Sequence, residues 1–575
     1  MGKSRQKKNP AATDNNTLQA YSGSILKEFH ALSEEEVLNR IQEHPAPRQL
    51  IQSLPSEDFF WLTKKMGEEG SLQLLRFASI EQWQYLLDLE LWRKDRLDMN
   101  TAFGWLRQLQ LADPGRLIGW LLTDGQALAY YYLFSNIQVE TREEDEAYDL
   151  DKGFVTLDGL FYVKVHETAQ RETIEGILRT MADADFLKYQ ALLSNLAGVL
   201  PAELEEQMYR LKNVRLAEHG FLPPEEALVV YGHLKPENLK RNLKTERVNS
   251  DVDEDILDFA PYLPLYYAEG RNLLSKTLSR DLDPGFLDRV RLEFAGLCNQ
   301  ILSADGLTIN DIDILKKTCR KSAGYLNLIL EQICGEDISA AEDLLKNNPL
   351  ISLFRAGFGL AQKLKWEAER WLKQSWFEQK GLGFDFWGEA WGSTLTGLTA
   401  KRPLYYEGEE EYGKYRDFEH VSELTAVSTV LHRLTGLDRM FAQLTETCPL
   451  DQKDGPPPDL TFHPLLFTLW ARQILDLAPS FDGIPLNQAK QFFHHLRAGD
   501  DKPPYQMPGF EERFIKDFMA AASGFDSQAA ATLKDTLSLI WQGFCQEYER
   551  VPVDALDRRF SRYILIFEES VGFKG

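Results

Sequence analysis

Cysteine is scarce in this chain of 575 residues, which has only five: Cys298, Cys319, Cys334, Cys448 and Cys545. The number is odd, the spacings are wide, and no Cys-x-x-Cys pair occurs. These features argue against a disulfide framework and against a site that holds a metal by thiolates. The sequence therefore predicts a reducing compartment, the cytoplasm, with most of the cysteines buried as small apolar residues.

The familiar signatures of metal, phosphate and catalytic sites are also missing. The ten histidines contain no His-Glu-x-x-His motif and no Cys/His spacing typical of zinc. His494 and His495 are adjacent, but neighbours on a helix diverge by about 100°, so a surface or partly buried pair is favoured over a metal site. Residues 392–399 have the glycine spacing of a phosphate loop, yet Leu398 stands where the lysine would be. We predict no metal, no cofactor and no identifiable catalytic residue.

No apolar run is long enough to cross a bilayer, since the nearest, residues 117–134, contains Asp124. Basic residues are outnumbered, 64 against 88 acidic ones, which gives a formal net charge of −24. Such a surface repels phosphate backbones, so nucleic acid is disfavoured as a partner. Apolar residues make up 43% of the chain, which is typical of a folded globular protein.

The stretch 49–134 predicts a series of short helices, each begun by a turn signal. Residues 55–58 place a proline and two acids in a first turn, where proline is tolerated and acids face the positive end of the helix. Ser79 with Gln82 fits a capping box, and Asp113 precedes a proline at another helix start. Each helix carries one apolar stripe. Helices this short are marginal alone, so we expect them to stack.

This pattern resembles the cytosolic N-terminal helical superhelix of MgtE-type magnesium transporters, in which short helices begin with a Pro/acid turn. The resemblance covers only this part of the chain. It implies a style of helix packing and not magnesium transport, because the membrane domain of the transporter has no counterpart in this sequence.

One β-hairpin is expected at residues 154–165. Two β-branched and aromatic runs flank Asp158 and Gly159, a dipeptide that favours a two-residue turn. A hairpin is not stable alone, so it must dock on helices or receive a third strand, for which residues 563–567 are a candidate. The acidic run that precedes it, residues 140–151, is interpreted as a solvated loop, because its oxygens lack the register of a calcium loop.

Two further segments carry a family resemblance. Residues 215–234 read RLAEHGFLPPEEALVVYGHL, and residues 353–360 read LFRAGFGL and precede a basic and aromatic helix. Both resemble blocks of an uncharacterised bacterial family, a domain of unknown function found mainly among delta-type proteobacteria. The family implies a mainly helical fold, and it brings no activity, ligand or catalytic residue.

The stretch 366–415 is the most suggestive place for a binding site. It holds five of the twelve tryptophans, interleaved with lysines and arginines. Aromatic rings beside cations suit an anionic or planar ligand, through stacking and cation–π contacts. If a pocket forms here, we expect Trp371, Trp387, Arg402 and Tyr406 to line it. The alternative is a packed junction between domains that the indoles anchor.

Together these patterns predict a mainly α fold: a superhelical array of stacked short helices, one small β-hairpin and a helical C-terminal part. The expected division is a tail at 1–24, the short-helix array at 25–135, an acidic loop with hairpin and helices at 136–245, a helical domain with an aromatic-rich loop at 246–453, and a helical part at 454–575. The function is interpreted as that of a non-enzymatic cytoplasmic scaffold or regulatory protein whose partner is another protein. The alternative is an enzyme or small-ligand sensor with a pocket within 366–415.

Overall fold

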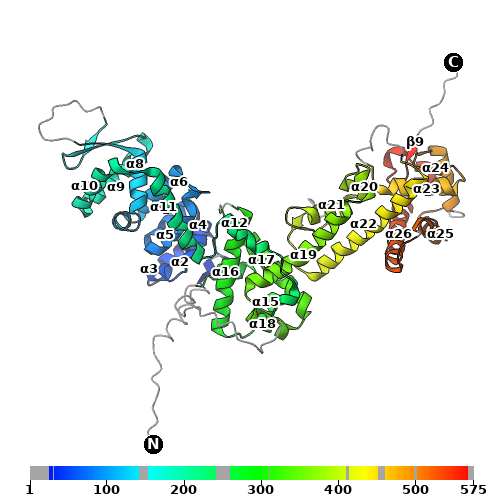
Figure 1. Cartoon of the computed structure of the whole chain (residues 1–575), viewed down its shortest axis with the longest axis horizontal. Helices are drawn as coiled ribbons and strands as arrows, with labels where there is room; N and C mark the ends of the chain where they lie inside the picture. Colours follow the sequence, from blue (N-terminus) through cyan, green and yellow to red (C-terminus); the bar gives the residue numbers. More distant parts are fainter. Residues whose placement is uncertain are drawn as a thin grey trace, which may run out of the picture. The chain divides into compact units, whose positions relative to one another are not determined.

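The computed structural model describes residues 25–567, apart from 27, 30, 142–152, 241–259, 308, 310, 409–413, 451–459, 498–501 and 523, and it gives no side-chain description for 68, 69 and 560. The described part is mainly helical (Figure 1), which confirms the predicted fold class. The chain divides into two compact units, Met1–Ala356 and Gly357–Gly575. The predicted tail at 1–24, most of the acidic run at 140–151 and the Pro-rich segment 454–458 lie outside the described residues.

Short helices dominate the first unit. Those up to residue 227 are α2 (Glu34–Gln42), α3 (Pro47–Gln52), α4 (Ser56–Phe77), α5 (Ile80–Glu90), α6 (Met99–Ala112), α7 (Pro114–Leu121), α8 (Gln126–Asn136), α9 (Arg171–Ala184), α10 (Phe186–Asn195), α11 (Pro201–Glu218) and α12 (Pro224–Ala227). They are followed by α14 (Leu263–Tyr267), α15 (Leu273–Leu278), α16 (Pro284–Asp305), α17 (Ile312–Cys334) and α18 (Ile338–Asn347). The division between the units falls within α19 (Leu350–Leu372).

The predicted helix starts are confirmed where local side chains cap them. The Ser79 hydroxyl accepts the Gln82 N–H at 3.2 Å, and the Gln82 side chain accepts the Ser79 N–H at 2.9 Å. Asp113 caps α7 by accepting the Arg116 N–H at 3.1 Å, with a proline at the next position. α4 is interrupted at Gly67, whose φ of 64° is in the left-handed region that favours glycine.

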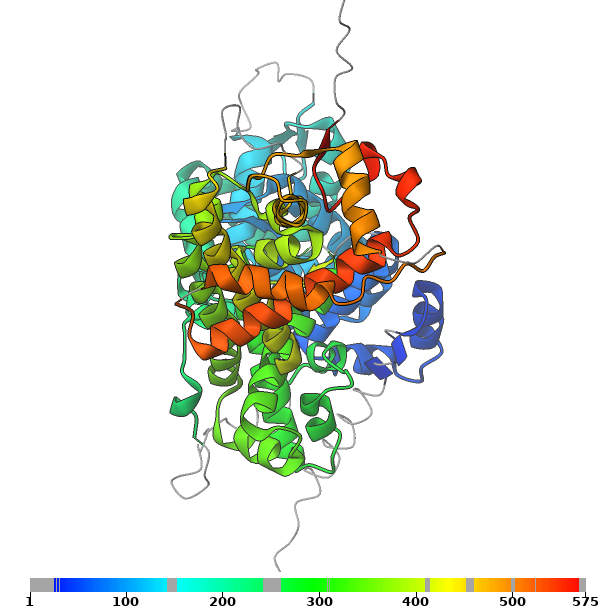
Figure 2. The ribbon, with the colours of Figure 1, turned by 90° about the vertical axis from the view of Figure 1, so that its right-hand side faces the viewer.

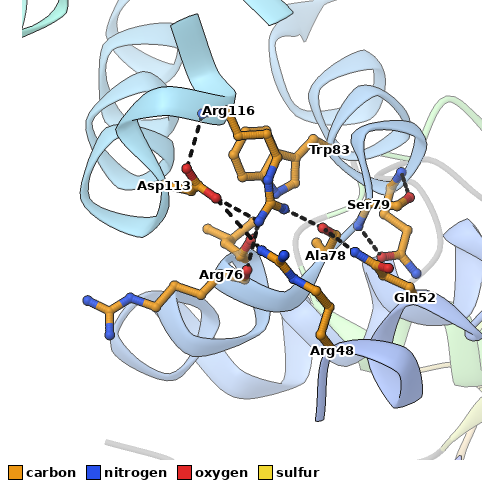
Figure 3. A network of polar contacts seen from close by, with 10 residues as sticks. Arg48, Gln52, Arg76, Ala78, Ser79, Trp83, Asp113 and Arg116 are labelled. Atoms are coloured by element: carbon orange, nitrogen blue, oxygen red, sulfur yellow. Dashed lines mark hydrogen bonds and ion pairs between the residues drawn. The ribbon is translucent and has the colours of Figure 1, made fainter. Parts of the chain in front are cut away.

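Arg116 of α7 contacts both α4 and α5 (Figure 3). The Arg116 guanidinium donates to the carbonyl oxygens of Arg76, at 3.0 Å, and of Ala78, at the C-terminal end of α4. It also donates to Asp113 at 2.8 Å and lies 4.9 Å from the centroid of the Trp83 ring in α5. Because the last carbonyls of a helix have no intrahelical donor, one cation here stabilises the end of α4 while it packs on α5.

Three strands form an antiparallel sheet in the order β3 (Ile137–Thr141), β5 (Phe161–Val165), β4 (Val155–Thr156). The predicted hairpin is β4 and β5, but the two-residue turn is wrong, because the pairing of Thr156 with Tyr162 leaves residues 157–161 between them. Asp158 instead accepts the N–H groups of Leu160 and Phe161, each at 2.9 Å, which closes a wider turn.

The third strand of the sheet is also not the predicted one. β3 fills this place, since it follows α8 directly and its whole length pairs with β5. The candidate segment 563–567 contains β9 (Ile566–Phe567), which pairs in parallel with β8 (Ile484–Pro485) in the second unit. Two further short pairs are β1 (Trp92–Arg93) with β2 (Arg96–Leu97), and β6 (Tyr405–Tyr406) with β7 (Tyr415–Arg416).

The second unit is built of helices around an aromatic core. After α19 come α20 (Trp376–Gln379), α21 (Glu389–Thr399), α22 (Val421–Thr447), α23 (Phe462–Ile474), α24 (Leu486–Leu496), α25 (Phe510–Met519) and α26 (Ser527–Tyr548). Its orange and red helices cross one another at the front of Figure 2. Phe467 of α23 lies at the centre of the core, with its ring stacked 4.2 Å from Phe544 and 4.9 Å from Phe514.

Candidate functional site

Trp371, the first of the four residues expected to line a pocket, is buried in the second unit against α22. Its indole N–H donates to a carboxylate oxygen of Asp438 in α22 at 3.2 Å. The same carboxylate accepts the backbone N–H groups of Trp376, at 3.1 Å, and Phe377, at 3.0 Å, and so caps α20. Burial raises the pKa of Asp438, and these three donors oppose that rise by stabilising the ionised form. These contacts all lie within the second unit, so they form part of its packed interior.

Trp387, the second, is 1% exposed and lies among other aromatic rings. Its ring centroid is 5.3 Å from that of Phe377 and 4.9 Å from that of Phe386. Trp371 also contacts Phe377, at 5.6 Å, so both predicted tryptophans pack against the same phenylalanine. The structure thus brings these two residues into one aromatic core.

Arg402 and Tyr406 are partly exposed, and they lie beyond the C-terminal end of α21. Tyr406 pairs with Tyr415 through β6 and β7, and their ring centroids are 5.5 Å apart. Of the four predicted residues, Trp387 alone is among the residues that line the cavity next to it. We expected aromatic rings and a basic side chain to line one pocket together, but Arg402 does not line this cavity.

The cavity beside Trp387 has a volume of about 260 Å³. It is formed by the first turn of α21, the start of α23, the middle of α26 and Tyr563 near the C-terminus. Its aromatic lining is Trp387, Trp391, Phe462, His463 and Tyr563. The rings of Trp391 and Phe462 are stacked, with centroids 5.5 Å apart and planes 8° from parallel. The volume is just below the usual range for small-molecule sites, so a compact ligand would fit.

A glycine allows Tyr563 to approach α26 at this cavity. A Cβ atom at Gly543 would lie 2.9 Å from the Tyr563 hydroxyl oxygen, closer than real Cβ contacts come. The Tyr563 ring is in turn 4.7 Å from the His463 ring, measured between centroids. Gly543 therefore sets the position of one aromatic wall.

The charge in the cavity is negative. Burial lowers the pKa of His463 to about 4, so its imidazole is neutral near pH 7. Glu389 contributes an exposed carboxylate at the first position of α21, and no lysine or arginine is among the residues that line the cavity. The sequence predicted lysine or arginine side chains at the binding site because these residues are frequent in 366–415. None of them lines this cavity, because the fold places their side chains elsewhere.

The first unit holds a buried polar cluster that sequence reasoning missed. Glu57 is 2% exposed, and its Oε2 accepts from the Asn299 amide at 3.1 Å, while that amide also donates to the His219 carbonyl oxygen at 2.8 Å. Among the described residues, Glu57 Oε1, the Tyr85 hydroxyl and Asn299 Oδ1 are buried without a hydrogen-bond partner. Burial raises the pKa of Glu57 to about 8, so the folded protein holds this carboxyl protonated near neutral pH.

The neighbouring acid, Asp58, has a different role. It is fully buried and accepts the N–H groups of Tyr262, at 2.8 Å, and Leu263, at 3.1 Å. Asp58 thereby caps α14 from a position 204 residues earlier in the chain. The predicted Pro/acid turn is confirmed as the start of α4. Its two acids, Glu57 and Asp58, are buried and form hydrogen bonds inside the unit.

Comparison with protein-family models identifies the family. A model described as "Family of unknown function (DUF6178)" matches residues 16–567. The chain belongs to this family. The match agrees with the resemblance of residues 215–234 and 353–360 to a domain of unknown function. No curated protein and no solved structure gives a significant match.

This DUF6178 chain shows no metal centre in its described part, where no group of three or more His, Cys, Asp or Glu side chains is placed to hold an ion. Within the same residues, no helix combines the length and apolar character that crossing a membrane requires. Cys298 and Cys319 are buried thiols whose sulfur atoms are 3.8 Å apart, in agreement with their expected burial.

Several of the exposed large apolar side chains of this DUF6178 chain lie on α10, on α11 or on the loop between them. Between residues 186 and 214, five large apolar residues have 46–77% of their surface exposed. We call these residues the α10–α11 surface: Phe186, Leu187, Leu200, Leu211 and Val214. α10 packs on α9 and α11 packs on α8 (Figure 1), which leaves these side chains on the outside of the first unit.

Proposed function

We propose that this DUF6178 protein is a non-enzymatic helical protein that binds another protein through the α10–α11 surface. The observation that carries the proposal is the exposure of Leu187, 77%, Val214, 64%, and Leu200, 58%. Single exposed apolar residues are normal, but a concentration of large ones marks an interaction site. The packed helices of the first unit hold the backbone of α10 and α11 in place beneath such a surface.

The shape of the surface supports the same proposal. α11 has 18 residues, of which nine are exposed and Leu216 alone is fully buried, so one side of the helix faces solvent. Beside Leu200 lies a hollow of about 320 Å³ whose lining includes Tyr130 and Leu204. A partner that inserts one apolar or aromatic side chain there would gain the buried anchor that dominates the energy of many interfaces.

The test compares two variants of the full chain in extracts of its native host. The double variant Leu187→Glu with Val214→Glu places two charges on the α10–α11 surface. Leu111→Glu is the matched control, because Leu111 is 57% exposed on α6 of the same unit. Quantitative cross-linking mass spectrometry should show a partner, or a second copy of the chain, that is lost from the double variant and kept by the control. Equal capture by both variants would refute the proposal.

The proposed location is the cytoplasm. The odd number and wide spacing of the five cysteines support it, since they argue against a disulfide framework, and the sulfur atoms of Cys298 and Cys319, 3.8 Å apart, provide a pair on which the redox state can be tested. Alkylation of the intact protein with and without a reductant, immediately after cell lysis, measures the oxidation state of the pair. A disulfide between them before reduction would contradict this location.

A second candidate function is the binding of a small molecule in the cavity beside Trp387. The aromatic lining and the volume of about 260 Å³ favour it. Native mass spectrometry of the full chain purified gently from its host should then show a bound molecule. The substitution Gly543→Val, which fills the space against Tyr563, should remove it, whereas Gly436→Val on the same unit should not.

A further inference from the structure

We infer that the cavity lined by Trp387, Trp391, Phe462, His463 and Tyr563 binds a small organic cation of the alkylammonium class. The inference rests on the second candidate function and adds the chemical class of the ligand. Three properties of the cavity carry it: the nature of its walls, the sign of its charge and its size.

The lining includes two tryptophans, a phenylalanine and a tyrosine, of which Trp391 and Tyr563 are partly exposed and Trp387 and Phe462 are buried behind them. The faces of aromatic rings carry negative electrostatic potential and attract cations, and tryptophan does so most strongly. Leu539 and Ile540 of α26 add aliphatic surface to the same lining. Methyl groups on an ammonium nitrogen suit such walls, because they spread the charge over an apolar surface that is easily desolvated.

The charge in the cavity selects against an anion. Glu389 supplies a full negative charge, and the lining contains no lysine or arginine. The first turn of α21 also faces the cavity, and the positive end of a helix amounts to about half an elementary charge. The carboxylate therefore outweighs the helix end. His463 adds no positive charge near pH 7, since burial lowers its pKa to about 4.

The size selects a compact ligand. The cavity is open to solvent and has a volume of about 260 Å³, below the range typical of drug-sized ligands, so the part of a ligand that it holds is small. A quaternary ammonium group with a short chain fills such a space. A planar neutral ring would also fit by volume, and the experiment below distinguishes it from a cation.

The experiment is isothermal titration calorimetry of the full-length protein with two matched probes. The first probe is choline, and the second is its neutral isostere, in which a carbon atom replaces the quaternary nitrogen. The two have the same shape, so the difference in Kd reports the charge. We expect choline to bind at least about tenfold more tightly than the isostere.

Two substitutions locate the binding. Glu389→Gln removes the charge at an exposed position, so it leaves the fold intact, and it should weaken choline about threefold to tenfold without changing the isostere. Trp391→Leu should weaken both probes. The matched control is Glu446→Gln, an exposed glutamate on α22 of the same unit, which should leave both Kd values unchanged.

The outcomes distinguish a failure of the cation class from a failure of the cavity as a ligand site. Equal affinity for choline and the isostere, with loss in Trp391→Leu, would overturn the cation class and keep the cavity as a ligand site. No binding of either probe at millimolar concentration would overturn the inference, whereas the second candidate function would be refuted only if native mass spectrometry of the protein from its host also showed no bound molecule. Choline binding that Glu389→Gln and Trp391→Leu leave unchanged would place the cation elsewhere and also overturn the inference.

Discussion

Glu57 allows a sharp prediction about stability and pH, through the substitution Glu57→Gln. The carboxyl is buried, and its pKa is raised from 4.5 to about 8, chiefly by loss of hydration. Between these two values the folded protein holds a proton that the unfolded chain releases. Stability from this group is therefore complete below about pH 4.5 and is lost as the pH rises through about 8. The amide of glutamine keeps the shape of the protonated acid and does not ionise.

The magnitude follows from the same shift. At about 1.4 kcal/mol for each pKa unit, the ionised form of Glu57 is disfavoured in the folded state by up to about 5 kcal/mol. Relaxation and entry of water lower this value, and part of the shift lies outside the window, so we expect Glu57 to contribute a loss of ~1–2 kcal/mol of unfolding free energy between about pH 6 and about pH 9. The loss should be smaller in Glu57→Gln, which becomes the more stable protein at high pH. Part of the loss remains in both proteins, because burial also raises the pKa of the neighbouring Asp58, to about 7.

The assay is urea unfolding of the two proteins at several pH values, followed by far-UV circular dichroism. Glu81→Gln is the matched control, because Glu81 is an exposed glutamate on α5 of the same unit and its loss should leave the pH dependence unchanged. An equal slope in the wild type and in Glu57→Gln would refute the reasoning. It would mean that the interior of the unit accommodates an ionised Glu57.

The remaining predictions concern contacts that hold helices together. Arg116→Ala should lower the unfolding free energy by ~2–3 kcal/mol, because two helix-end carbonyls lose their donor, whereas the exposed Arg107→Ala should cost under ~0.5 kcal/mol in the same urea assay. Gly543→Ala should cost ~1–3 kcal/mol by thermal unfolding, whereas Gly436→Ala, with 3.9 Å of clearance, should be neutral or stabilising. Asp438→Ala should cost ~2–4 kcal/mol, since three buried donors lose their acceptor, and unchanged calorimetric stability would contradict this.

The α10–α11 surface and the aromatic cavity lie in different units, so their tests are independent. Failure of the double variant to change partner capture would leave the cavity proposal in place. Failure of both probes to bind would leave the partner-binding proposal in place. The likeness of residues 49–134 to the helical domain of MgtE-type transporters stays a prediction about packing style.

The sequence alone determined the features that depend on near neighbours in the chain. The mainly helical class, the capping box at Ser79 and the start of α7 all arise from contacts within one helical turn, where a side chain reaches its own backbone. The hairpin at 154–165 was also predictable, because alternating apolar residues and a turn lie in one short segment. The predicted connection failed because Asp158 bonds two later N–H groups and widens the turn.

Only the tertiary structure determined which side chains are buried by contacts between segments that are far apart in the sequence. Glu57 meets Asn299 across 242 residues, and no local pattern shows that a charged residue in a first turn will be dehydrated. Trp387 joins His463 and Tyr563 in one cavity, whereas Arg402 and Tyr406, closer to it in sequence, do not line it. The physical reason is that hydrogen bonds of a cap act over a few residues, whereas desolvation and ring packing depend on which helices come to lie together.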